Sequence, residues 1–207
     1  MPTGERRSDP LPAARRRPRP SLDRLRDGSA VRLRPVLPSD QPRIAAFLAH
    51  VSVDSLERRY FSAVTPEHVA LEIVGPPVAR DRLSLLVELV EGRPGPVIAH
   101  GECDRLPTDP TRAEVAFLVA DDRQGQGAAT LLLREIARRA AADGVAQLEA
   151  VVQAENRPMV DVFLGSGFPC SIAWQEGEGH VVLDISHEPT SPGLPRGASC
   201  DYPLVPA

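Results

Sequence analysis

Apolar and polar residues between positions 31 and 185 follow patterns that predict both strands and helices. Apolar residues at every second position, or in short runs, indicate strands at 31–35, 83–90, 97–104, 113–120, 147–152 and 180–185. Helical spacing and capping residues indicate helices at 40–47, at 53–61, from Thr65 onward, at 127–143 and from Asn156 onward. Strands and helices that mix in this way without an internal repeat predict a domain of the α+β class.

The helix predicted at 127–143 has the clearest pattern. Leu132, Ile136 and Ala140 form one apolar stripe along it, and Gly144 fits the position just past a helix end, where glycine is favoured. A strand is predicted before this helix and another after it.

Both ends of the sequence lack this periodicity. Residues 1–29 are rich in Pro and Arg, and residues 187–207 are rich in Pro, so we expect a disordered tail at each end and a folded domain over 30–186. The basic run 15–19 could touch nucleic acid or an anionic lipid, but a solvated tail is the favoured interpretation.

Composition narrows the class of protein. The chain has 207 residues, 42% of them hydrophobic, which is enough for one domain with a core. No apolar run reaches the roughly 20 residues that span a bilayer, and no apolar segment follows the Arg-rich start, so we expect a cytoplasmic protein without a membrane partner. Three cysteines without CxxC spacing indicate neither a disulfide framework nor a metal site.

Charge is distributed unevenly along the chain. Residues 1–34 carry ten Arg and four acidic residues, a formal charge of +6, and the whole chain carries −4, so residues 35–207 carry −10. An acidic body favours a cationic ligand such as an amine and disfavours nucleic acid, although it also suits any soluble protein. The sequence contains no lysine, so no side-chain ammonium is available for self-acylation.

A glycine-rich loop lies between the strand at 113–120 and the helix at 127–143. Unpartnered backbone N–H groups and the helix dipole make such a helix start an anion site, and small residues let a pyrophosphate approach the backbone. A Walker loop would need Gly-Lys-Ser/Thr, which is absent. A dinucleotide-binding fingerprint would need a third glycine where Thr130 stands. The loop therefore matches neither of these two nucleotide-binding motifs.

This loop, Gln124-Gly125-Gln126-Gly127-Ala128-Ala129, resembles the Q/R-x-x-G-x-G/A motif of GNAT acetyltransferases. The resemblance covers about residues 31–185, and within the family it extends to bacterial protein lysine acetyltransferases through two blocks, Ser52–Phe61 and Ala113-Glu114-Val115-Ala116-Phe117. It implies a GNAT fold, with a twisted, mostly antiparallel sheet and helices on both faces. It also implies transfer of an acyl group, expected to be acetyl, from acetyl-CoA to an amine.

The resemblance assigns roles to specific residues. The pantetheine arm of CoA is expected along Phe117, Leu118 and Val119. The pyrophosphate is expected against Gln124, Gly125, Gln126, Gly127, Ala128, Ala129 and Thr130. Asn156 stands where family members place a polar contact to the cofactor, but it equally fits a simple helix cap.

The reaction also needs a base, because an ammonium must lose a proton before its nitrogen attacks a thioester. Glu114 is the best candidate: its position matches the family's catalytic glutamate, and a carboxylate within a central strand is costly unless it faces a cleft or a partner. The alternative is a structural Glu114 held by a salt bridge, for which Arg59 is one candidate partner. Glu102, on the neighbouring strand, is the reserve candidate.

One position departs from the family pattern. Many GNAT enzymes have a Tyr seven residues after the Asn, which protonates the CoA thiolate, whereas this chain has Phe163. The general acid therefore stays unassigned, and a catalytically silent acyl-CoA sensor stays open as an alternative function. The acceptor stays open between a protein lysine and a small-molecule amine. We expect a monomer or homodimer.

Overall fold

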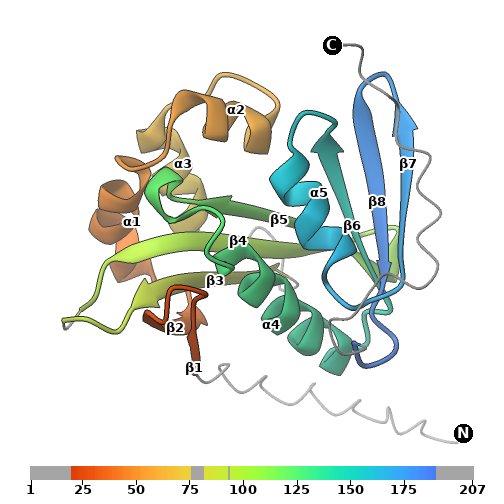
Figure 1. Ribbon diagram of the computed structural model, residues 1–207, viewed down its shortest axis with the longest axis horizontal. Helices are drawn as coiled ribbons and strands as arrows, with labels where there is room; N and C mark the ends of the chain where they lie inside the picture. Colours follow the sequence, from red (N-terminus) through yellow and green to blue (C-terminus); the bar gives the residue numbers. More distant parts are fainter. Residues whose placement is uncertain (1–19, 76–81, 93, 190–207) are drawn as a thin grey trace, which may run out of the picture.

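Eight strands form one continuous sheet within the described residues, 20–75, 82–92 and 94–189, of the computed structural model (Figure 1). In chain order they are β1 (Ser21–Arg24), β2 (Ala30–Pro35), β3 (Arg82–Leu89), β4 (Val97–Leu106), β5 (Asp109–Val119), β6 (Gln147–Gln153), β7 (Cys170–Gln175) and β8 (Glu178–Asp184). Their order across the sheet is β1-β2-β3-β4-β5-β6-β8-β7. All neighbours are antiparallel except β5 and β6, which are parallel.

Helices cover both faces of this sheet, which confirms the α+β class. They are α1 (Gln41–Leu48), α2 (Val53–Tyr60), α3 (Pro66–Val74), α4 (Ala128–Ala142) and α5 (Arg157–Leu164), with short 3-10 turns η1 (Pro38–Asp40) and η2 (Asp121–Arg123). Figure 1 shows α4 and α5 in front of the sheet and the fainter α1 and α3 behind it. Two separate apolar clusters result, one under α4 and α5 and one under α1, α2 and α3.

Helix α4 packs against the centre of the sheet through the predicted apolar stripe. Leu132 and Ile136 are fully buried. Gly101 on β4 lies beneath them, and a Cβ there would meet side-chain atoms of Leu132 and Ile136 at 3.2 Å. The missing side chain therefore lets the helix approach the sheet closely. Gly144 follows the helix with a φ of +88°, as predicted.

The predicted boundary of the N-terminal tail at residue 29 is wrong, because residues 21–24 form β1 and pair with β2. Leu25, directly after β1, is buried in the main core. The apolar pattern misses this edge strand because backbone hydrogen bonds hold it while its side chains stay exposed, Leu22 by 72%. Residues 1–19 and 190–207, the rest of the predicted tails, lie outside the described residues.

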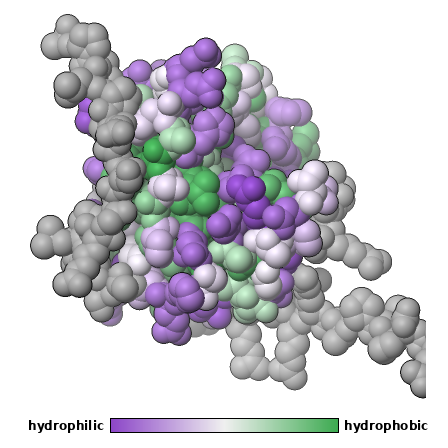
Figure 2. All heavy atoms as spheres, turned by 90° about the vertical axis from the view of Figure 1, so that its right-hand side faces the viewer, coloured by the Kyte–Doolittle hydropathy of each residue, from purple (hydrophilic) through white to green (hydrophobic). Residues whose placement is uncertain are grey.

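The other edge of the sheet is β7, which the pattern also does not predict. Figure 2 views the molecule from this side and shows hydrophobic residues near the centre of the face with hydrophilic residues around them. Both strands that escape prediction are thus edge strands, with one neighbour each.

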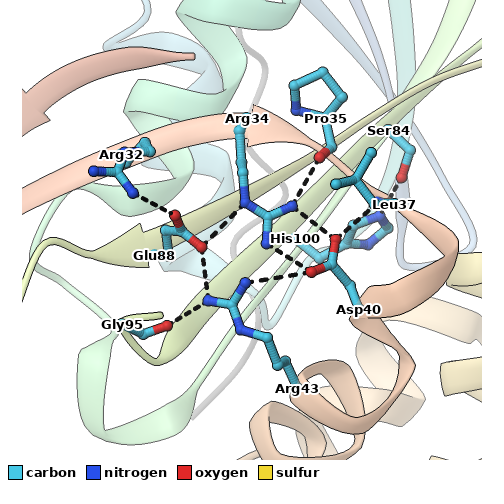
Figure 3. Close-up of polar contacts among 10 residues, drawn as sticks. All are labelled: Arg32, Arg34, Pro35, Leu37, Asp40, Arg43, Ser84, Glu88, Gly95 and His100. Atoms are coloured by element: carbon cyan, nitrogen blue, oxygen red, sulfur yellow. Dashed lines mark hydrogen bonds and ion pairs between the residues drawn. The ribbon is translucent and has the colours of Figure 1, made fainter. Parts of the chain in front are cut away.

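A buried ion-pair network ties β2 and β3 to the start of α1 (Figure 3). Asp40 and Glu88 are each only 3% exposed. Arg34 donates two hydrogen bonds to Asp40, both 2.7 Å long, and one of 3.1 Å to Glu88. Arg43 donates to the same two carboxylates at 3.3 and 2.6 Å, and Arg32 completes the network at Glu88. The network thus fixes the helical layer relative to the sheet.

None of the helices in the described ranges has both the length and the apolar character needed to cross a bilayer.

Candidate functional site

The sheet opens between the parallel strands β5 and β6. They pair at Arg112–Gln147, Ala113–Leu148 and Glu114–Glu149, and their pairing ends there. Figure 1 shows the consequence: β5 runs across the view while β6 and β8 turn steeply away from it. Strand β4 pairs along one edge of β5. On the opposite edge, the backbone N–H and C=O groups of residues 115–119 are not paired with β6, so they face the opening.

A cleft of about 890 Å³ occupies this opening and extends to the glycine-rich loop. The structure brings every predicted site residue to it, from the strand, the loop and the next helix. These residues are Glu114, Phe117, Leu118, Val119, Gln124, Gly125, Gln126, Gly127, Ala128, Ala129, Thr130 and Asn156.

The loop turns the chain from β5 into α4 through two left-handed glycines. Gly125 has a φ of +72°, and Gly127, the N-cap of α4, has a φ of +97°. The N–H groups of Ala128, Ala129 and Thr130 have no acceptor within the helix, because each would need a carbonyl four residues earlier. Together with the dipole of this 15-residue helix, they form an anion site at the cleft.

The start of α2 holds this loop in place through Asp121. The Asp121 carboxylate accepts hydrogen bonds from the Ser52 backbone at 3.2 Å and the Ser55 hydroxyl at 2.8 Å. Although burial raises the pKa of Asp121, these hydrogen bonds bring the pKa below its usual value. Ser52 also caps α2, and Ser55 lines the cleft.

The side chain of Gln124 belongs to the same cluster. Its amide nitrogen donates to Asp121 at 3.1 Å and to the Ser55 hydroxyl at 3.2 Å. This side chain therefore braces the loop from within, and its backbone is the part left to meet a ligand.

Glu114 lies where β5 and β6 separate, with its side chain exposed to the cleft. Its cross-strand neighbours are also acidic, Asp104 on β4 and Glu149 on β6. Burial, with the nearby charges of Glu102 and Glu114, raises the pKa of Asp104. Asp104 and Glu149 are ion-paired with Arg82 and Arg112, so Glu114 is the carboxylate of this group that meets an approaching cation at the cleft.

Arg59 was the suggested partner for a structural, salt-bridged Glu114, but Arg59 bonds to Glu102 instead. Within the described part of the chain, Glu114 makes no ion pair. Glu102 is 6% exposed and accepts hydrogen bonds from both Arg59 and Arg82. Burial raises the pKa of Glu102, but the nearby His100, Arg59 and Arg82 together outweigh burial and lower it. The reserve candidate is therefore engaged in holding α2 to the sheet.

Three further residues of the cleft lining, Asn156, Phe163 and Tyr60, differ in the polar groups that they present to a ligand. Asn156 is the N-cap residue of α5, but its side chain accepts no capping hydrogen bond, which leaves the amide available to the cleft. Phe163 is 2% exposed and packs against Phe117, with ring centroids 6.3 Å apart. Tyr60, beside Arg59, carries a phenol in the cleft lining, and burial raises its pKa to about 12.

Several arginines also line the cleft, although the sequence assigned none of them to it: Arg24, Arg26, Arg58, Arg59, Arg123 and Arg134. Arg24 and Arg26 come from the segment expected to be disordered. A basic cleft on a chain of net negative charge suits an anionic ligand such as a phosphate ester.

Comparison with known proteins agrees with this geometry. The sequence profile described as "Acetyltransferase (GNAT) family" matches residues 51–168, more than half of the chain. The chain belongs to the GNAT family. The fold predicted from the loop motif is thereby confirmed, since the splayed, mostly antiparallel sheet is shared with solved GNAT structures.

Individual relatives are named as acetyltransferases or acyltransferases. "Acetyltransferase Pat" of Mycolicibacterium smegmatis is 35% identical over 135 residues, which is 65% of this chain and 40% of that protein. The GNAT domain of S. lividans PAT matches with a TM-score of 0.69 and 30% identity over 80% of this chain and 96% of that one. A cAMP-binding acyltransferase from Mycobacterium smegmatis matches with a TM-score of 0.57 and 29% identity over 86% of this chain but only 50% of that one.

Proposed function

We propose that this GNAT protein transfers an acetyl group from acetyl-CoA to an amine, and that the amine is a lysine side chain of another protein. The observation that carries the proposal is the cleft itself. A free strand edge, a helix N-terminus and an exposed carboxylate converge on one opening between β5 and β6.

The donor fits this opening in one direction. The pyrophosphate meets the N–H groups of residues 128–130, with Gln124, Gly125, Gln126 and Gly127 around it. The pantetheine arm then extends along Phe117, Leu118 and Val119, and its amides bond to the free edge of β5 as a further strand would. Asn156 supplies a polar contact from the opposite wall.

This path leads the thioester towards Glu114. From Val119 to Glu114 the strand rises about 17 Å. Glu114 accepts a proton from the acceptor ammonium, directly or through water, and the freed nitrogen attacks the thioester carbonyl. A C–N bond forms, the C–S bond breaks and the thiolate leaves. Phe163 has no proton to donate, so solvent protonates the thiolate.

A lysine acceptor is supported by Glu114 and by the relatives. The Glu114 carboxylate is exposed to the cleft, makes no ion pair among the described residues and favours a positively charged side chain. The matched relatives are named Pat and PAT, proteins whose names place them among acetyltransferases. A small-molecule amine is the competing acceptor.

A second candidate function is a silent acyl-CoA sensor. Phe163 favours it, because the position that often carries a catalytic hydroxyl here holds a buried phenyl ring. Glu114, exposed and without an ion pair among the described residues, favours catalysis instead.

The test is release of CoA from acetyl-CoA, followed with a thiol reagent, in the presence of lysine-bearing proteins or of small amines. Mass spectrometry of a lysate treated with enzyme and acetyl-CoA then locates the acetylated lysines. Because the enzyme has no lysine of its own, acetyl-lysine peptides report only on acceptors. Acetyl-CoA binding without CoA release for any acceptor would instead identify a sensor, and release with small amines alone would exclude protein lysine.

A further inference from the structure

The turn after β1 packs directly on the glycine-rich loop. Leu25 is 4% exposed and anchors the turn in the main core. The Leu25 N–H donates to the Ser29 carbonyl at 2.9 Å, and Gly28 donates back to the Leu25 carbonyl at 3.0 Å. The turn is thus closed on itself, and it presents Arg26 to its neighbour.

Arg26 holds the loop at three places. Its backbone N–H donates to the Gln126 carbonyl at 2.9 Å. Its guanidinium donates to the Gly125 carbonyl at 3.2 Å. Its side chain also covers Gly127, where a Cβ would lie 3.6 Å from the Arg26 Cγ and 3.8 Å from its Nε. These contacts join residues about a hundred positions apart in the sequence.

These contacts leave several hydrogen-bond donors of the Arg26 guanidinium for a ligand. A guanidinium has five N–H donors, and Gly125 takes one of them. Among the described residues no carboxylate pairs with Arg26, and the side chain is exposed and lines the cleft. A free cation therefore lies beside the unpartnered N–H groups that begin α4.

We infer that Arg26 is a phosphate-binding residue of the acyl-CoA site, and that β1 with its turn is an additional element of that site. The inference rests on the proposed function for the identity of the ligand. A guanidinium at this place binds a phosphate oxygen with a charge-assisted hydrogen bond, either on the pyrophosphate or on the 3′-phosphate of CoA. Its backbone N–H meanwhile donates to the carbonyl of Gln126.

The test is calorimetric titration of wild type and Arg26→Gln with acetyl-CoA. We expect the affinity of the variant to fall about tenfold, as for the loss of a charge-assisted hydrogen bond. Affinity should also depend less on salt in the variant, because one cation–phosphate interaction is missing. Arg26→Lys keeps the charge and should recover part of the affinity.

Two donors and one control separate binding from structure. S-acetylpantetheine lacks both phosphate groups, so its turnover by Arg26→Gln should match that of the wild type. With 3′-dephospho-acetyl-CoA, a persistent tenfold loss assigns Arg26 to the pyrophosphate, and an abolished loss assigns it to the 3′-phosphate. Arg138→Gln, which removes an exposed arginine of α4 paired with Glu135 outside the cleft, should bind as the wild type does.

Other outcomes would overturn the inference. Equal acetyl-CoA affinity for wild type and Arg26→Gln excludes Arg26 while leaving the proposed function intact. An equal loss with S-acetylpantetheine, or a melting temperature well below that of Arg138→Gln, makes Arg26 a structural brace. A wild type that does not bind acetyl-CoA at all removes the proposed function as well.

Discussion

Glu114 and Glu102 show how neighbouring carboxylates on one sheet face acquire different roles. Both lie on the same face, since Glu102 is paired across the strands with Ala116, two residues from Glu114. Glu102 is buried and held by two arginines, whereas Glu114 lies at the point where β6 departs and its carboxylate meets the cleft. The divergence of two strands, rather than residue type, thus makes one of them available for proton transfer.

We predict that Glu114→Gln lowers kcat by about 10²–10⁴-fold at neutral pH, the usual range for loss of a general base. The dissociation constant of acetyl-CoA, measured by calorimetry, should barely change. The deficit should shrink as the pH rises towards about 10.4, the ordinary pKa of lysine, because more acceptor is then already deprotonated.

Glu102→Gln is the matched comparison. It should lower the melting temperature, because Arg59 and Arg82 lose their buried partner, and it should not reproduce the pH-dependent loss of kcat. If Glu102→Gln shows that pH-dependent loss while Glu114→Gln stays active, the base lies on β4. If Glu114→Gln no longer binds acetyl-CoA, the residue is structural.

Among the elements, the start of α4 carries the anion site, and its geometry depends on Gly127. The left-handed φ of +97° lets the loop turn into the helix without a side chain in the cleft. We predict that Gly127→Glu abolishes measurable acetyl-CoA binding, because a carboxylate then faces the pyrophosphate position. Calorimetry measures the binding, and circular dichroism reports whether the fold remains.

Gly144→Glu is the control for backbone strain. Gly144 has a similar φ of +88°, lies past the opposite end of α4, and has open space where its Cβ would be. The two variants share a strain of about 1 kcal/mol and the added charge. Undiminished binding by Gly127→Glu, or equal losses in both variants, would contradict the assignment of the loop.

The ion-pair network that joins β2, β3 and α1 makes a prediction about acid stability (Figure 3). Burial raises the pKa of Asp40 and Glu88, but the surrounding arginines outweigh it, so both values lie below their usual 3.8 and 4.5. A depressed pKa contributes stability above the unfolded value and loses it as the pH falls through the folded value. The melting temperature should therefore drop as the pH falls below about 4.5.

Glu88→Gln tests this network. The variant removes the buried carboxylate that three arginines share and should lower the free energy of unfolding by about 3–5 kcal/mol at neutral pH. Part of the acid-dependent loss should disappear with it. Glu91→Gln, at an exposed position in the same hairpin, should change neither quantity. An unchanged acid profile in Glu88→Gln would show that other carboxyls govern acid unfolding.

On the scale of the whole molecule, the sequence predicts the parts whose side chains reveal their surroundings. Leu132, Ile136 and Ala140 mark α4 because one face of that helix is buried. The loop motif identifies the cleft because glycines are needed at its left-handed positions. The edge strands β1 and β7 escape, because backbone pairing holds them without an extended apolar pattern. Arg26 escapes with β1, since only the tertiary structure brings it to Gly125.

The correction of the N-terminal boundary leads to a prediction about truncation. Removing residues 1–19, whose sequence has no apolar periodicity, should leave the melting temperature and the acetyl-CoA affinity unchanged. Removing residues 1–29 deletes β1 and the buried side chain of Leu25. Burial of a leucine is worth about 2 kcal/mol, which at this chain length corresponds to a fall of about 4–8 °C.

The longer deletion should also weaken acetyl-CoA binding at least as much as Arg26→Gln does, because it removes the cation and the backbone donor to Gln126 together. Leu25→Ala separates the two effects, since it should lower the melting temperature while Arg26 remains in the chain. Scanning calorimetry and acetyl-CoA titration of the wild type, the two truncations and Leu25→Ala test both expectations. Equal melting temperatures and affinities for the two truncations would mean that β1 contributes to neither the fold nor the cofactor site, and that the folded domain begins at residue 30.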